Sequence, residues 1–175
     1  MSRKPLTTQE EAQILHLKEV GILVDIMEQK ISPYTIVVAC GDGHEYPDIF
    51  DHHRSLCRAN GHEDNGHLMI HHHLANGGPL VLAANSPLNH KLPGDEVLLA
   101  QMGDSFEIKE THHVLLRLHA PCGAARLIGM GPNEQVEALA DIQARIMQAY
   151  PVVRISRLFD VRYPDGRQRS YFINL

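Results

Sequence analysis

The chain has 175 residues, of which 43% are hydrophobic and 21% are charged. These values predict a single globular domain over residues 1–175 and argue against a disordered tail, a collagen or a low-complexity linker. The chain has sixteen Lys and Arg and twenty-one Asp and Glu, which gives a net charge of −5. This negative charge, and the lack of a Lys/Arg cluster in the sequence, argue against nucleic-acid binding. The longest apolar run, residues 79–84, is too short for a bilayer, and the acidic start is unlike a secretory signal. We therefore expect a cytoplasmic protein without membrane contact.

The first predicted element is a helix over residues 7–30, which makes residues 1–33 an N-terminal helical arm. Thr7 and Thr8 are each followed three residues later by a glutamate, as in a capping box. Apolar residues then follow helical spacing, at Leu17, Val20, Val24 and Met27. Ser32-Pro33 ends the segment.

The remaining elements alternate between strands and helices. Buried strands are predicted at residues 34–39, 80–84 and 114–118, helices at 48–59, 95–110 and 133–150, and a hairpin at 152–162 and 168–174. Asn133 is the expected cap of the last helix, and residues 61–78 read as a loop with room for one helical turn. The apolar strands are continuous rather than alternating. This pattern predicts an α/β fold with a short, mostly parallel sheet flanked by helices and an antiparallel edge or hairpin at the C-terminus.

Potential metal ligands follow two of the predicted strands. Cys40 opens a Cys-x-Asp-x-His sequence with Asp42 and His44, and His119 opens a His-x-x-Cys sequence with Cys122. In a parallel sheet ligands collect at the carboxyl ends of the strands. Two thiolates and one imidazole are typical of a catalytic zinc site whose fourth position takes water or substrate. A cysteine at a buried strand end is often only a small hydrophobic residue, but two such sets about 80 residues apart arise by chance far less often than one.

At these residues the sequence resembles the β-class carbonic anhydrases. That family carries Cys-x-Asp-x-Arg after its first strand and His-x-x-Cys-Gly after a later one, and residues 38–44 and 118–124 are similar to these motifs. Residues 80–85 and 160–166 are more weakly similar to a family strand and turn. The resemblance implies that Cys40, His119 and Cys122 bind zinc and that Asp42 orients or replaces the zinc-bound water. It also implies carbon dioxide or bicarbonate as the small-molecule substrate, with zinc-bound hydroxide attacking the carbon of carbon dioxide.

The departure from the family lies at His44, which stands where the family has arginine. That arginine pairs with the aspartate and holds it away from the metal, whereas an imidazole has neither a fixed fork of donors nor a permanent charge. Asp42 could then bind zinc as a fourth ligand and close the site, unless protonated His44, Arg54 or Arg126 holds it. Three functions stay open: carbon dioxide hydration with Asp42 and His44 as catalytic residues, a non-catalytic zinc protein, and a zinc hydrolase of another small electrophile.

Thirteen histidines are a further feature of the sequence. Most of those within residues 52–73 and at 112–113 are expected on the surface, because adjacent residues on a regular element point in different directions. One near the zinc could relay protons. Cys57, on the predicted 48–59 helix, is expected to be structural.

Assembly is a separate question. The predicted first helix has more apolar residues than one face needs, with Ile14, Leu15, Ile22, Leu23 and Ile26 in excess. The resemblance suggests that a second subunit covers them, in a homodimer or a higher homo-oligomer. The alternative is that they pack on the chain's own sheet.

Overall fold

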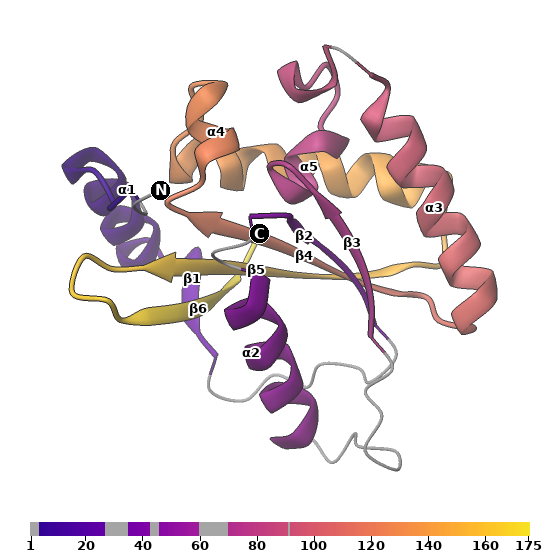
Figure 1. The fold of residues 1–175 in the computed structure, drawn as a ribbon, viewed down its shortest axis with the longest axis horizontal. Helices are drawn as coiled ribbons and strands as arrows, with labels where there is room; N and C mark the ends of the chain where they lie inside the picture. The colour runs from indigo at the N-terminus through magenta and orange to yellow at the C-terminus, as the bar shows by residue number, and fades with distance from the viewer. Residues whose placement is uncertain (1–3, 27–34, 43–45, 60–69, 91) are drawn as a thin grey trace.

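The computed structural model describes residues 4–26, 35–42, 46–59, 70–90 and 92–175 (Figure 1). In chain order the elements are α1 (Thr8–Glu19), β1 (Leu23–Asp25), β2 (Thr35–Cys40), α2 (Tyr46–Ala59), β3 (Ile70–Ala75), the 3-10 helices η1 (Gly78–Leu82) and η2 (Pro87–Asn89), α3 (Gly94–Lys109), β4 (His113–Ala120), α4 (Gly123–Leu127), α5 (Pro132–Ala149), β5 (Arg154–Arg162) and β6 (Gln168–Ile173).

The strands form one mixed sheet of six, in the order β1-β6-β5-β4-β2-β3. Strands β3, β2, β4 and β5 run parallel, whereas β6 is antiparallel to β5 and β1 is antiparallel to β6. The predicted α/β class is confirmed, and so is the C-terminal hairpin, which β5 and β6 form. Gly166 has a φ of 85° in the turn between them, a conformation that favours glycine.

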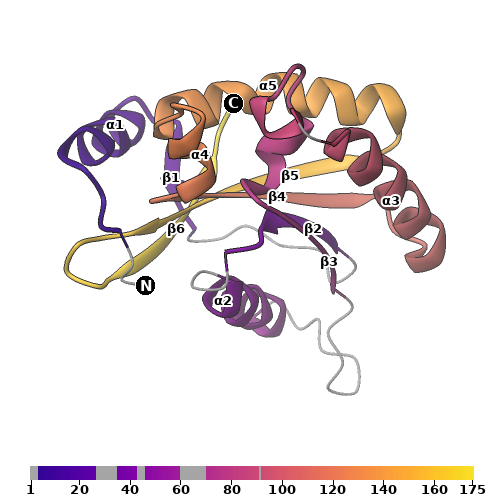
Figure 2. The ribbon, with the colours of Figure 1, turned by 45° about the horizontal axis from the view of Figure 1, so that its top comes forward.

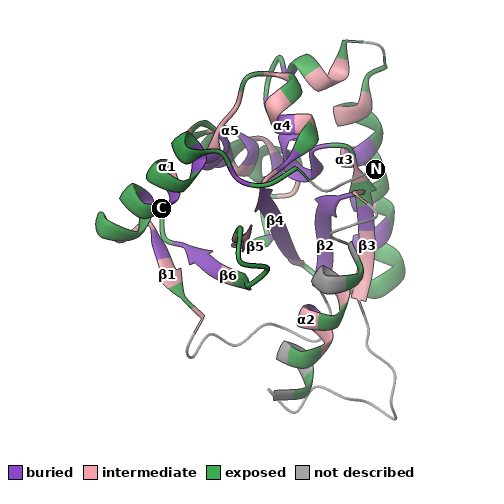
Figure 3. Cartoon of the chain, turned by 60° about the vertical axis from the view of Figure 1, so that its left-hand side comes forward, coloured by how far each residue is buried: buried purple, intermediate pink, exposed green. Residues whose placement is uncertain are grey.

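Helices cover the two faces of the sheet unequally (Figure 2). Helices α1, α3, α4 and α5 lie on one face, and α2 lies on the other. The main apolar cluster takes Ile36 and Val38 of β2 together with side chains of the helices on the first face. The intervening Val37 and Ala39 belong to a smaller cluster with Leu115, Leu158 and Phe172. Strands β2 and β4 are therefore buried on both faces, as their continuous apolar sequences predict (Figure 3).

The predicted helix over residues 7–30 is wrong beyond its first half. Thr7 caps α1 in the predicted capping box with Glu10, but the helix ends at Glu19. Gly21 follows with a φ of 77°, which terminates the helix, and Leu23–Asp25 pairs with β6 as a strand. The N-terminal segment is thus a helix followed by an edge strand. Met27 lies outside the described residues.

Most of the apolar residues expected in excess on this segment are covered within the chain. Ile14 and Leu23 are buried in the main cluster, and Ile22 and Ile26 pack against the two clusters. Leu15 is 56% exposed. Packing on the chain's own fold accounts for four of the five residues, so these residues do not call for a second subunit.

The predicted strand at residues 80–84 is also wrong, because Gly78–Leu82 forms the 3-10 helix η1. Gly77 and Gly78 both have positive φ, and Pro79 stands in the first turn of η1. All five residues of η1 are buried, since it contacts the sheet as well as α3 and α5. A short element that is buried on all sides has a continuous apolar sequence whether it is a helix or a strand.

The predicted loop over residues 61–78 contains a strand instead. Ile70–Ala75 forms β3, which pairs in parallel with β2 along its full length. Residues 60–69 lie outside the described part of the chain. The strand was missed because three of its six residues are histidines, which carry no apolar pattern.

The other helices are close to their predicted positions. α3 begins one residue early, and α2 begins two residues early with Pro47 in its first turn. Gly131, not Asn133, is the N-cap of α5; the Gly131 N–H donates to the Glu134 carboxylate at 2.9 Å, and Pro132 occupies the first helical position. The short helix α4 was not predicted.

Candidate metal centre

Three potential ligands converge where the central strands end. Cys40 is the last residue of β2, His119 lies near the end of β4, and Cys122 is the N-cap of α4. Because β2 pairs directly with β4, the ends of these strands are neighbours. The ligand atoms of the three residues all lie within 4.8 Å of one another, and the residues are 4%, 3% and 2% exposed. The structure thus brings together the cluster that the sequence predicts.

A hydrogen bond links the Cys40 and Cys122 thiols and shifts their pKa values in opposite directions. The hydrogen bond with Cys122 lowers the pKa of the Cys40 thiol below its usual value although burial acts to raise it, and His119 acts in the same direction as the hydrogen bond. The Gly77 N–H also donates to Cys40 Sγ at 3.4 Å. The same hydrogen bond and burial raise the pKa of Cys122, against the backbone N–H groups of Ala124 and Ala125. The hydrogen bond therefore favours ionisation of Cys40 over ionisation of Cys122.

The donor set and its spacing fit zinc. In a tetrahedral zinc site with Zn–S of about 2.3 Å and Zn–N of about 2.0–2.1 Å, neighbouring ligand atoms lie about 3.5–3.8 Å apart. The observed limit of 4.8 Å leaves only a small adjustment of the side chains. Two sulfurs and one imidazole nitrogen favour zinc over magnesium or calcium, which take oxygen ligands.

A cleft of about 590 Å³ opens beside the cluster, and Cys40 itself lines it. Its wall combines polar groups, among them Asp42 and Asn89, with apolar side chains from the ends of several elements. Asn89 Nδ2 donates to the Val81 carbonyl at 2.8 Å, which ties the η2 segment to η1 at the wall of this cleft. A small molecule in the cleft would therefore lie against Cys40 and the Asp42 carboxylate.

Of the two expected catalytic residues, Asp42 and His44, only Asp42 belongs to the part of the chain that the structure describes. Asp42 is partly buried and lines the cleft. His44 lies outside the described residues. Arg54 is on α2, across the sheet from α4 (Figure 2).

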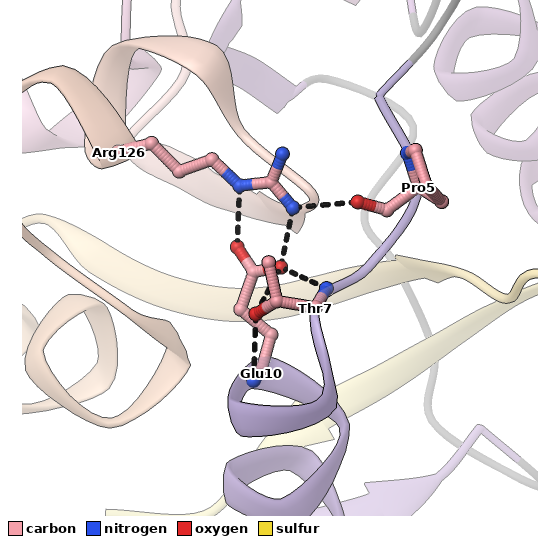
Figure 4. A network of polar contacts seen from close by, with 4 residues as sticks. All are labelled: Pro5, Thr7, Glu10 and Arg126. Carbon is pink, nitrogen blue, oxygen red and sulfur yellow. Dashed lines mark hydrogen bonds and ion pairs between the residues drawn. The ribbon is translucent and has the colours of Figure 1, made fainter.

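Arg126, expected as a possible partner for Asp42, pairs instead with the N-terminal helix. Its guanidinium donates from Nε to Glu10 Oε1 at 2.8 Å and from Nη2 to the Pro5 carbonyl at 2.7 Å (Figure 4). Glu10 also accepts from the Thr7 N–H at 2.8 Å, so one carboxylate completes the capping box and the ion pair. Burial acts to raise the pKa of Glu10, but its hydrogen bonds with Arg126 hold that pKa below its usual value. This network anchors α4, whose N-cap is Cys122, to α1.

Two adjacent glycines that the sequence analysis does not single out contact Cys40 and the backbone beside it. Gly77 donates its N–H to the thiol, as above, and Gly78 packs against the backbone of β2. A Cβ added to Gly78 would lie 2.7 Å from Cys40 N and 2.8 Å from the Ala39 carbonyl carbon. The sequence Gly77-Gly78-Pro79 was the available signal, because adjacent glycines mark positive φ or a close backbone approach.

The expectation that the histidine runs lie on the surface is wrong for several of them. His53 is fully buried and His73 is 8% exposed, whereas His112 is exposed. Burial lowers the pKa of His53 to about 3 and the pKa values of His72 and His73 to about 4. Neighbours do point in different directions: the His72 ring lies 6.5 Å from the His53 ring, and His71 and His73 pack together at 4.9 Å.

A buried ion pair lies next to this histidine face. Arg117 of β4 donates from Nε and Nη2 to the two carboxylate oxygens of Asp160 on β5, at 2.9 and 2.6 Å. His52 Nδ1 lies 3.1 Å from Arg117 Nη2, and the Ser170 hydroxyl donates to Asp160. Burial acts to raise the pKa of Asp160, but the Arg117 charge and hydrogen bonds hold it below its usual value. In the sequence, the signal for a buried charged partner is Arg117, which interrupts the apolar residues 114–118.

Comparison of the sequence with models of protein families and with curated proteins gives no match. In the described part of the chain, no helix combines the length and the apolar character needed to cross a membrane.

Proposed function

We propose that this protein binds one zinc ion through Cys40, His119 and Cys122 and hydrates carbon dioxide, as the resemblance to the β-class carbonic anhydrases implies. One observation carries the proposal: two thiols and an imidazole converge, buried, beside a cleft that Cys40 lines. Structural zinc sites have four protein ligands, whereas catalytic sites have three and an open position. Three ligands beside a cleft match the second kind.

Zinc in such a site is a Lewis acid that lowers the pKa of bound water to about 7. Residues of the chain itself hold the ligands around the position that the zinc ion would occupy. The Gly77 N–H donates to Cys40 Sγ and holds it in place, and both cysteines are buried. Asp42, on the wall of the cleft, has the role of orienting the reacting molecule and accepting a proton.

A second candidate function is hydrolysis of a larger uncharged electrophile at the same cluster. The volume of the cleft favours it, because about 590 Å³ lies in the range of roughly 300–1,000 Å³ that holds drug-sized ligands. Carbon dioxide, with three atoms, needs far less. Both candidates use the same three ligands, so one metal analysis tests them together.

The experiment measures zinc in the purified chain and in three cysteine variants. We expect about one zinc per chain in the unmodified protein and in the control Cys57→Ser, and loss of most of it in Cys122→Ser, because a neutral hydroxyl poorly replaces a thiolate. Full zinc content in both Cys40→Ser and Cys122→Ser would refute the site.

Stopped-flow hydration on the same preparations then tests the reaction. Activity that Asp42→Asn lowers supports hydration. A zinc-loaded protein without activity, which gains activity in His44→Arg, would instead favour the closed, non-catalytic site, because arginine can hold the Asp42 carboxylate away from the metal.

A further inference from the structure

Two histidines of β3 lie side by side on the face of the strand that contacts α3. His71 and His73 are two residues apart, so their side chains leave the strand on the same face. Their ring centroids are 4.9 Å apart, with 57° between the ring planes. His73 is buried, whereas His71 is partly exposed. The pair therefore has one ring held inside the fold and one ring that solvent reaches.

The spacing of the two rings is that of two ligands on one metal ion. An imidazole nitrogen lies about 1.2 Å from the ring centre and a zinc–nitrogen bond is about 2.0–2.1 Å long, so each ring centre lies about 3.2 Å from a bound ion. Two such rings are then about 4.5 Å apart at a ligand angle of about 90° and about 5.2 Å apart at about 109°. The observed 4.9 Å lies between these values. The backbone therefore needs no displacement for the two histidines to share an ion.

Hydrogen bonds with α3 prepare the ring of His73. His73 Nε2 lies 3.0 Å from Ser105 Oγ, and the Ser105 hydroxyl donates to the Gln101 carbonyl at 2.8 Å. That bond uses the only hydrogen of the hydroxyl, so Ser105 Oγ accepts from His73 Nε2–H. The proton thus lies on Nε2, and Nδ1 keeps its lone pair. Metal-binding histidines have this arrangement, in which the second ring nitrogen donates to an acceptor of the protein.

Both rings are neutral at pH 7, which is the form of histidine that binds metal. Burial lowers the pKa of His73 to about 4. Burial and the charge of Lys109 lower the pKa of His71 below its usual value. Lys109 is an exposed residue of α3, and its charge also repels a bound cation. This lysine therefore limits the affinity of the pair for metal.

The donor atoms select the kind of ion. Imidazole nitrogens suit nickel, copper and zinc, whereas magnesium and calcium take oxygen ligands. Within the described residues, only Cys40, His119 and Cys122 form a group of three potential ligands, so an ion at the histidine pair keeps water at its other positions. We propose that His71 and His73 form a second metal site, which binds Ni²⁺, Cu²⁺ or Zn²⁺. This site goes beyond the proposed function and shares no ligand with it.

The test titrates the full chain at pH 7 with Ni²⁺ alone, which is paramagnetic and does not oxidise thiols. Calorimetry measures the affinity, and NMR locates the ion through the broadening of nearby amide signals. We expect broadening centred on β3 and on Ser105, which bonds to His73. We expect no nickel–thiolate absorption, since that would mark an ion at Cys40 and Cys122.

Four variants make the test specific. His71→Ala removes a ligand and should weaken Ni²⁺ binding at least tenfold, because even the loss of an outer-shell partner costs about 10–100-fold. Ser105→Ala removes the acceptor that orients His73 and should weaken binding about tenfold. Lys109→Gln should strengthen binding about twofold or more, and this exposed residue leaves the core intact. His112→Ala is the control, because this histidine is exposed and outside the pair, and the affinity should not change.

The outcomes separate this proposal from the proposed function. Equal affinities in the unmodified chain and in His71→Ala overturn the second site, and so does broadening centred on other histidines. Binding that appears only together with nickel–thiolate absorption overturns it as well. Cys40→Ser and Cys122→Ser should leave the titration unchanged, so a chain that fails to hold zinc at the cysteine cluster refutes the proposed function and leaves the histidine site standing.

Discussion

Replacing His53 with phenylalanine should make the stability of the fold less sensitive to acid. His53 lies on α2 and is fully buried, and among the described residues neither of its ring nitrogens has a hydrogen-bond partner. Burial, together with the charges of Arg117 and His72, lowers its pKa from 6.5 to about 3. The folded protein therefore keeps this imidazole neutral over a range in which the unfolded chain protonates it.

The sign and size of the effect follow from this difference. Between pH 6.5 and about 3 the unfolded state binds nearly one proton more than the folded state at His53, so the free energy of unfolding falls as the pH falls. The slope contributed is close to 1.4 kcal/mol per pH unit, or about 2 kcal/mol lost between pH 7 and pH 5. A domain with a total stability of roughly 5–15 kcal/mol would show this clearly.

Urea unfolding followed by circular dichroism at pH 7, 6 and 5 measures it. The wild-type chain should lose about 2 kcal/mol more than His53→Phe over this range. The exposed His112 supplies the control, because His112→Phe should follow the wild-type pH dependence. Equal slopes in wild type and His53→Phe would show that His53 is not kept neutral by burial, and the reasoning would fail.

Two further substitutions test the supports of the metal cluster. Glu10→Gln should lower the free energy of unfolding by about 1–2 kcal/mol in urea, because Arg126 loses a charged, largely buried partner, while the exposed neighbour Glu11→Gln changes it little; equal losses in the two variants would contradict this. Gly78→Ala should cost about 2–4 kcal/mol, since φ is 57° and the new Cβ would meet the β2 backbone. Gly123→Ala has open space and should be neutral or slightly stabilising, so similar results for the two glycines would rule out the steric account.

The parts of the fold that could be predicted are those in which the sequence pattern and the final environment agree. The continuous apolar sequences of β2 and β4 reflect burial on both faces, and the turn residues around Gly166 mark the hairpin. Residues 78–82 have the same apolar pattern for another reason, because η1 is surrounded on all sides. β3 gave no pattern at all, since its pairing with β2 makes it a strand despite its histidines.

The candidate site could also be predicted only in part. The residue types and their places after two predicted strands indicate the three ligands, because the ends of parallel strands share one edge of a sheet. It could not show that β2 and β4 are direct neighbours, which is what brings Cys40 within reach of His119. The supporting contacts of Gly77, Gly78 and Arg126 join segments far apart in the sequence, and only the tertiary structure reveals them.

The buried Arg117–Asp160 pair also links β4 to β5. In the observed register Arg117 lies beside Leu158 and His119 lies beside Asp160, so the ion pair runs diagonally between the two strands. The two side chains are 1% and 3% exposed, so replacing one of them would leave the other buried without its charged partner, at a cost of several kcal/mol. The packing of β4 against β5 therefore depends on both members of this one ion pair.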